Sequence, residues 1–205
     1  MGRPLGLLRA GYPYLKTLGM RRVTDYPYDL AFGPDDKLYV LCRTSGRAFI
    51  RVWTFDDAER LTDDLVQIGA YGSNDGQFQW PVQIITDCDG NLYVSDEATH
   101  KVSKFNPEGE LIHTYFVDQV DVKPNHALPA SLIVDEQGKT AFGIQPRGHD
   151  RTLRISINSR NELYVLDAKR GRIHKFDGNG DKLHAFGRYG AGHGEFDRDA
   201  SDIAI

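Results

Sequence analysis

Hydrophobic residues in this chain occur in short runs that are bounded by glycine, proline, asparagine or aspartate. The clearest example extends from Leu153 to Phe196, where the pattern predicts four short strands followed by a glycine-rich connector. No long stretch has the spacing of hydrophobic positions that an amphipathic helix requires. The pattern therefore predicts an all-β protein built from short strands and tight turns.

The same pattern recurs along the chain, which identifies a repeat protein. Residues 84–116 align without a gap to residues 155–187, and both segments contain a Leu-Tyr-Val strand, an aspartate after it and a Lys-Phe pair. The connector at residues 71–78 aligns in the same way to residues 189–196. Repeated residues report on architecture, so candidate functional residues are those that depart from the repeat.

The repeat divides the chain, which we treat as a single domain over residues 1–205, into units. We expect full units at 27–70, 81–117 and 153–187, a lone strand at 14–19 and the first strand of a further unit at 200–205. Residues 118–152 start like a unit but leave no room for its third and fourth strands, so they form either a degenerate unit or an inserted hairpin. In the first unit, we expect strands at 29–32, 37–41, 51–55 and 65–69, with a longer loop over 43–48.

The pattern Pro-x-x-Ile-x-x-Asp-x-x-Gly-Asn-Leu-Tyr-Val-x-Asp, a later Lys-Phe strand and a Tyr-Gly-x-x-x-Gly-x-Phe connector resemble the NHL repeat. The resemblance implies a β-propeller, usually six-bladed, in which each blade is a four-stranded antiparallel sheet; about four blades would lie in this chain. Such a sheet cannot bury both of its faces alone, so neighbouring blades must pack together. The repeated aromatic residues are then filling between blades rather than ligand contacts: Tyr39, Tyr93, Tyr164, Phe55, Phe105 and Phe176.

The resemblance also implies that the strand at 14–19 closes the ring by pairing with strands from the C-terminal end. Here the chain stops within a first strand, and six blades need on the order of 250–300 residues. We therefore expect a partial propeller, or one that closes by oligomerisation through its unpaired edges.

Charge and cysteine usage narrow the classes of function. The formal net charge is −4 and the pI is near 6.0, which disfavours a nucleic-acid binder. No apolar run approaches the ~20 residues that span a membrane, and no signal peptide is evident, so a cytoplasmic location is favoured. Cys42 and Cys88 are expected on opposite faces, which excludes a disulfide between them.

Two groups of residues are candidates for a site. In a propeller of this kind, the loops between strands two and three and the connectors between blades share one face, which we call the loop face, and variable loops on a rigid scaffold carry function. Its candidates are Arg43, Arg47, Trp80, His100, His126, Arg170 and His193. The second group occupies one repeat position at the start of strand one, the innermost strand: Asp29, Gln83, Ser131, Arg154 and Asp202. This ring can bind a small polar ligand or a divalent cation such as Ca²⁺ in the channel, or it can bond to backbone groups.

Relatives of the resembled family include amidating lyases, which bind metal through histidines placed just after the proline of strand one. Those positions hold Tyr28, Val82, Ala130, Leu153 and Ser201, so that chemistry is disfavoured. We predict a scaffold that binds a protein, peptide or small molecule through its loop face. The alternative is a propeller hydrolase or lyase that uses a cation in the channel, and apart from that cation we expect no cofactor.

Overall fold

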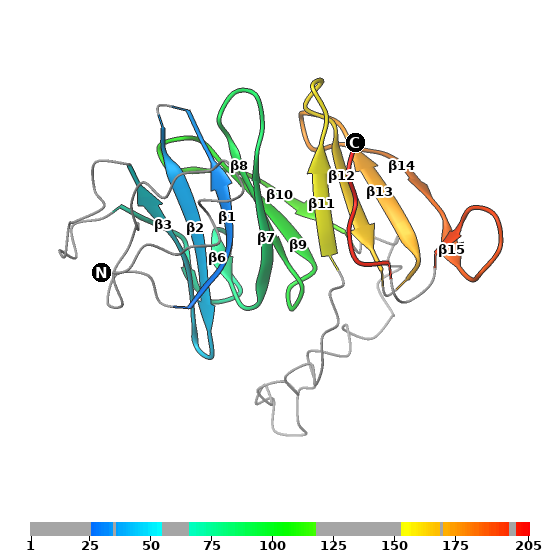
Figure 1. Ribbon diagram of the computed structural model, residues 1–205, viewed down its shortest axis with the longest axis horizontal. Coiled ribbons are helices and arrows are strands. Elements are labelled where there is room, and N and C mark those ends of the chain that lie inside the picture. The colour runs from blue at the N-terminus through cyan, green and yellow to red at the C-terminus, as the bar shows by residue number, and fades with distance from the viewer. Residues whose placement is uncertain (1–25, 35, 55–65, 118–152, 169, 197–199) are drawn as a thin grey trace, which may run out of the picture.

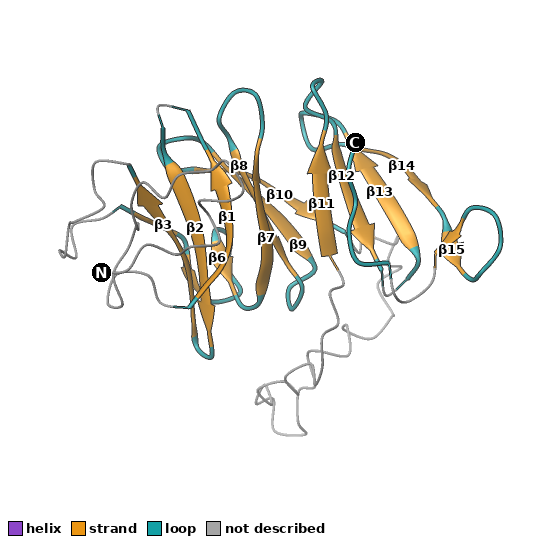
Figure 2. Ribbon diagram, viewed as in Figure 1, coloured by secondary structure: helices purple, strands orange, loops and turns teal. Residues whose placement is uncertain are grey.

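A computed structural model describes residues 26–34, 36–54, 66–117, 153–168, 170–196 and 200–205. These residues form strands and loops, and no helix occurs among them (Figure 2). None of the described residues therefore belongs to a helix that is long and apolar enough to cross a membrane. The predicted strand at 14–19, the segment at 118–152, Phe55, His126 and Ser131 lie outside the described residues.

The described strands form three four-stranded antiparallel sheets, each with its strands in chain order. The first blade contains β1 (Pro27–Phe32), β2 (Leu38–Thr44), β3 (Arg47–Trp53) and β4 (Gln67–Ile68). The second contains β7 (Pro81–Thr86), β8 (Leu92–Asp96), β9 (Lys101–Phe105) and β10 (Leu111–Phe116). The third contains β11 (Leu153–Ile157), β12 (Leu163–Asp167), β13 (Arg172–Phe176) and β14 (Lys182–Phe186).

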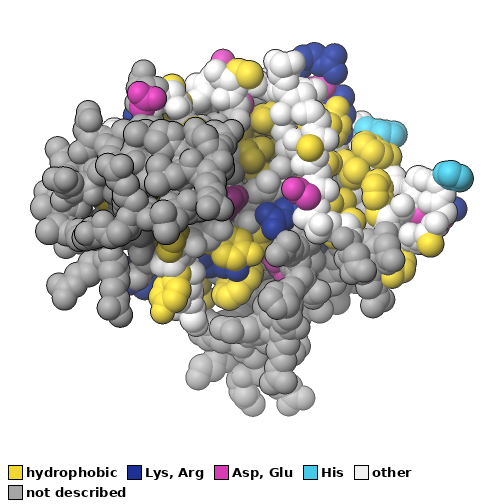
Figure 3. All heavy atoms as spheres, in the orientation of Figure 1, with side chains coloured by type: hydrophobic (Ala, Val, Ile, Leu, Met, Phe, Trp, Pro, Cys, Tyr) yellow, Lys and Arg dark blue, Asp and Glu magenta, His cyan; other side chains and the backbone are white. Residues whose placement is uncertain are grey.

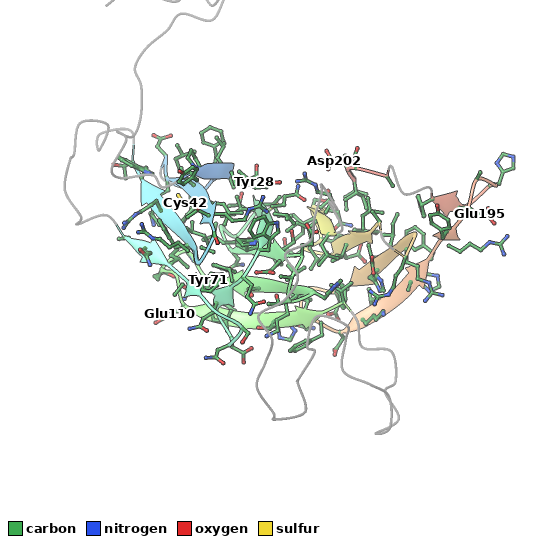
Figure 4. The ribbon with its side chains drawn as sticks, turned by 90° about the horizontal axis from the view of Figure 1, so that it is seen from below. Tyr28, Cys42, Tyr71, Glu110, Glu195 and Asp202 are labelled. Carbon is green, nitrogen blue, oxygen red and sulfur yellow. The ribbon has the colours of Figure 1, made fainter. Side chains whose placement is uncertain are left out.

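The three sheets stand side by side as consecutive blades of a β-propeller, which confirms the predicted fold class (Figure 1). The first strands β1, β7 and β11 are neighbours, so they form the inner side of the arc. Figure 4 shows Tyr28 and Asp202 along the edge where β1 and β11 run, and Tyr71 and Glu110 toward the opposite edge. The connectors of the loop face lead directly into these first strands, so the loop face meets the inner side at residues such as Pro27 and Pro81.

Short parallel strand pairs form the glycine-rich connectors. β5 (Ala70–Tyr71) pairs with β6 (Gln77–Phe78), and β15 (Arg188–Tyr189) pairs with β16 (Glu195–Phe196). Both connectors follow a glycine in the left-handed region, Gly69 at φ 73° and Gly187 at φ 87°. A Cβ at either glycine would lie 2.3 Å from the ring of the connector phenylalanine, so glycine is required for both its backbone angle and the space it leaves.

Two hydrophobic clusters fill the spaces between blades. The cluster between the first and second blades includes Tyr39, Ile84 and Phe105, all at most 2% exposed. The cluster between the second and third blades includes Tyr93 and Phe176. The predicted role of the repeated aromatic residues is confirmed for these positions, whereas Tyr164 is only half-buried.

The first blade corrects one prediction. Residues 43–48 were expected to form a loop, but β2 continues to Thr44 and β3 begins at Arg47, so only Ser45 and Gly46 turn the chain. Gly46 has φ 75°, which suits a two-residue hairpin turn. These strands do not alternate between hydrophobic and polar residues, because both faces of the hairpin are buried. Leu41 and Ile50 are buried on one face, and Cys42 and Phe49 on the other.

The turns on the face opposite the loop face are held by an Asx residue. In the second blade, Asp87 Oδ1 accepts hydrogen bonds from the N–H groups of Asp89 and Asn91, at 3.0 and 2.8 Å. Its Oδ2 accepts one from the Tyr93 hydroxyl at 3.1 Å, and burial beside this carboxylate raises the pKa of Tyr93. Asn158 caps the equivalent turn of the third blade in the same way. These contacts explain why the repeat contains Asp or Asn there.

Candidate binding surface

An arginine lies between two aromatic rings where the first and second blades meet on the loop face. The Arg43 guanidinium lies 3.6 Å from the ring centroid of Tyr28 and 4.2 Å from that of Trp80. Its Nη1 donates a 2.9 Å hydrogen bond to the Pro81 carbonyl, which fixes the guanidinium in place. We call Tyr28, Arg43 and Trp80 the aromatic–arginine stack. Tyr28 is 42% exposed and the other two are half-buried, so the stack reaches solvent.

Pro81 begins β7, the first strand of the second blade, and a second arginine bonds this strand from the third blade. Arg154, near the start of β11 in the third blade, donates a 3.3 Å hydrogen bond from Nη1 to the Val82 carbonyl. Arg43 and Arg154 thus bond adjacent carbonyls of β7, one from each neighbouring blade. Among the described residues, neither guanidinium forms an ion pair with a carboxylate. Figure 3 shows basic side chains beside hydrophobic ones near the middle of this side of the molecule.

The ring positions on the first strands form hydrogen bonds between blades. Asp29 Oδ2 accepts from the Ile84 N–H at 2.9 Å, and Gln83 Oε1 accepts from the Ile155 N–H at 2.8 Å. The two donors, Ile84 and Ile155, each follow the ring residue of the next blade, which is Gln83 in the second blade and Arg154 in the third. These contacts agree with the expectation that ring residues bond backbone groups, here on the neighbouring blade. A cation at this ring stays a prediction.

We expect Gln83→Met to destabilise the fold by about 1–2 kcal/mol, because methionine fills the space but leaves the Ile155 N–H without its acceptor. Urea unfolding followed by fluorescence measures the change. Gln83→Glu keeps an acceptor oxygen and is expected to lose less. Equal losses in the two variants would show that the contact between blades contributes no net stability.

Arg154 interrupts this series because a guanidinium cannot accept a hydrogen bond. Its side chain points back to the second blade, whereas Asp29 and Gln83 bond the blade that follows them. The next ring residue, Asp202, accepts a hydrogen bond from the adjacent Ile203 N–H at 2.9 Å. Ile203 and Ala200 pack against Leu166 and Ile173 of the third blade, as a following first strand would.

Asp96, the aspartate that ends strand two, holds the loop face together. Its Oδ2 accepts from the N–H groups of Gln79 and Trp80, at 2.6 and 3.0 Å. Its Oδ1 accepts from those of Ala98 and Thr99, at 2.9 and 3.0 Å. Burial raises the pKa of Asp96, and the four N–H donors act against that rise. One carboxylate therefore positions both the connector that carries Trp80 and the following loop.

The equivalent residues of the other two blades differ. Asp167 is fully buried and accepts a 2.8 Å ion-paired hydrogen bond from the Arg170 guanidinium, together with one from the Arg170 N–H at 3.2 Å. Arg170 thus has a structural contact at its own loop. In the first blade Cys42 occupies this position as a buried thiol, and Cys88 is an exposed thiol in the turn that Asp87 caps.

The remaining loop-face candidates do not join the stack. Arg47 begins β3, and its guanidinium lies 5.7 Å from the Phe49 ring centroid on the first blade. His100 precedes β9 with φ 52°, and its carbonyl accepts the Val117 N–H. His193 is exposed in the connector between β15 and β16. No group of three or more metal-binding side chains occurs in the described ranges of the chain.

Sequence reasoning chose Arg43, Trp80 and Arg154 but missed Tyr28 as their partner. Tyr28 was considered only as a position where lyases place a histidine. The sequence did contain a signal for this contact. Tyr28 and Trp80 each lie next to the proline that begins a first strand, Pro27 or Pro81. Arg43 follows Cys42, which pairs with Pro27. Their contact depends on how two blades pack, which the repeat pattern does not specify.

Comparisons with known proteins agree with the fold. No family profile matches the chain. Protein brain tumor of Drosophila melanogaster is 24% identical over 143 residues, which cover 59% of this chain and 14% of that protein. The structure of U3-55K superimposes with a TM-score of 0.50 at 10% identity, over 83% of this chain and 41% of that one. The extracellular domain of a putative one-component system from B. thetaiotaomicron gives 0.49 at 14% identity, over 82% and 19%.

The three packed four-stranded sheets define a β-propeller, and the chain spans less than half of the length of each of these proteins. The NHL assignment and the six-bladed ring stay predictions from the sequence.

Proposed function

We propose that this chain is a β-propeller binding module that recognises a peptide or protein segment through the aromatic–arginine stack on its loop face. The observation that carries the proposal is the Arg43 guanidinium held between the rings of Tyr28 and Trp80. Tryptophan, tyrosine and arginine are the residues most enriched at the energetic centres of protein interfaces. Here the three lie in one cluster that the fold brings together.

The rigidity of the stack supports this role. Arg43 is fixed by the Pro81 carbonyl, and the backbone of Trp80 is fixed by Asp96. Side chains that are ordered before binding lose little conformational entropy when a partner docks, so a fixed surface binds more tightly than a mobile one. The exposed part of Tyr28 gives a partner apolar area beside a cation.

We expect Trp80→Ala to weaken binding of a selected peptide by about thirtyfold or more, as loss of a central interface residue does. A library of short random peptides displayed on phage is selected against the protein, and the affinity of an enriched peptide is measured by calorimetry. Removing the indole takes away one wall of the stack and leaves the Trp80 N–H to bond Asp96.

The matched control is Tyr71→Ala, which removes an exposed aromatic ring from the other end of the connector that carries Trp80, toward the opposite edge of the molecule (Figure 4). Its affinity is expected to equal that of the unchanged protein. The proposal is wrong if no peptide is enriched, or if Trp80→Ala and Tyr71→Ala weaken binding to the same extent.

A further inference from the structure

We propose that the segment bound at the aromatic–arginine stack presents a carboxylate to Arg43 and Arg154. This inference rests on the proposed binding function and specifies the chemistry of the partner. It joins residues from all three described blades: Arg43 from the first, the two carbonyls of β7 from the second and Arg154 from the third.

Each of the two guanidiniums keeps unused donors near the start of β7. Each carries five N–H donors, and each donates one hydrogen bond to a described residue, to Pro81 and to Val82 respectively. The accepting carbonyls belong to adjacent residues, whose Cα atoms lie about 3.8 Å apart. The Nε of Arg154 is buried and has no hydrogen-bond partner. In this proposal the carboxylate bonds Nη donors that the contacts to Pro81 and Val82 leave unused.

Among the residues that the structure describes, no carboxylate forms an ion pair with either arginine. Both are half-buried, and buried cations in proteins are usually paired. Within the same described ranges, Arg160, Arg170 and Arg188 each pair with a carboxylate. Asp29, the acidic residue beside Tyr28, accepts the Ile84 N–H instead. In a chain with net charge −4, Arg43 on β2 and Arg154 on β11 thus bond the same strand without an ion pair to any described residue.

A peptide carboxylate fits better than a nucleic-acid phosphate. Guanidinium groups bind carboxylates through two parallel hydrogen bonds, and the rings of Tyr28 and Trp80 supply apolar area for the chain that carries the carboxylate. Nucleic-acid binding draws on many basic contacts along a backbone, which an acidic chain does not favour. The carboxylate comes from an aspartate or glutamate side chain, or from a peptide C-terminus.

The test uses the same peptide selection in two formats, one with a free C-terminal carboxyl group and one with the C-terminus blocked. Enrichment of Asp or Glu in both formats supports a side-chain carboxylate, and enrichment in the free format alone supports a terminal one. For a synthetic peptide of the enriched sequence, Arg154→Gln is expected to weaken binding about tenfold to a hundredfold, because a hydrogen-bonded charge contact is lost. Arg154→Lys keeps the charge and is expected to recover part of that affinity.

The control is Arg160→Gln, which removes the same charge from an exposed arginine in the turn between β11 and β12 and is expected to leave the affinity unchanged. If enriched peptides carry no carboxylate and bind Arg154→Gln as tightly as the unchanged protein, the inference is wrong while the binding function stands. Displacement of the peptide by single-stranded RNA, with Arg154→Gln weakening the RNA complex, also overturns it. Failure to enrich any peptide overturns the binding function itself.

Discussion

Replacing Asp96 with alanine is expected to lower the free energy of unfolding by about 3–5 kcal/mol. The change removes the acceptor of four backbone N–H groups at once, and water cannot easily reach a site where the carboxylate is only 2% exposed. Urea unfolding of the purified variant measures the loss. The same variant is expected to lose peptide binding, because the backbone of Trp80 is no longer fixed.

Asp96→Asn gives a graded comparison. The amide keeps one acceptor oxygen but turns its NH₂ group toward two N–H donors, so we expect a loss smaller than that of the alanine variant but still large. Asp75→Ala, at an exposed carboxylate in the preceding connector, is the control and is expected to change stability little. If Asp96→Ala unfolds at the same urea concentration as Asp75→Ala, the carboxylate does not hold the loop face.

Replacing Phe78 with alanine is expected to destabilise the protein by about 3–5 kcal/mol, in the range measured for buried phenylalanines. Phe78 is fully buried in the cluster between the first and second blades, and its ring packs edge-on against Phe105 with centroids 5.8 Å apart. Removing it opens a cavity at the seam on which the stack is built. Thermal and urea unfolding both report the loss.

Phe196→Ala is the matched variant, because Phe196 occupies the same repeat position and packs against its own glycine in the same way. Phe196 is only half-buried, beside Ala200 and Ile203, so its loss is expected to be clearly smaller. Equal effects would mean that the connector itself, and not the seam between blades, sets the contribution of this phenylalanine.

Asp96 and Phe78 show why stability and binding are coupled in this fold. The end of the connector that leads into the second blade is fixed by Phe78 in the core and by Asp96 through the N–H groups of Gln79 and Trp80. Trp80 forms one wall of the stack. Variants that loosen the connector are therefore expected to weaken binding in proportion to their loss of stability, whereas Trp80→Ala weakens binding with less loss of stability.

Much of the architecture was predictable from the sequence because it depends on local chemistry. The Asx residues that cap turns, the glycines before the connectors and the alternating strands each act within a few residues, and all recur in the repeat. The long first hairpin was not predicted. The polar residues at the tip of this hairpin, including Arg43 and Arg47, indicated a loop. The strands continue to the tip because two hydrophobic clusters pack against the two faces of β2 and β3.

The sequence by itself determined the all-β propeller fold, the three described blades and the aromatic residues that fill the spaces between them. It also identified Arg43 and Trp80 as loop-face candidates and Arg154 as a ring residue that departs from the other copies of the repeat. Only the tertiary structure decided that Tyr28 and Trp80 enclose Arg43, that Asp29 and Gln83 bond the following blade, and that Arg154 reaches back to the preceding one. The physical reason is that these contacts cross the seams between blades, where the geometry comes from the packing of whole sheets and not from the order of residues within one.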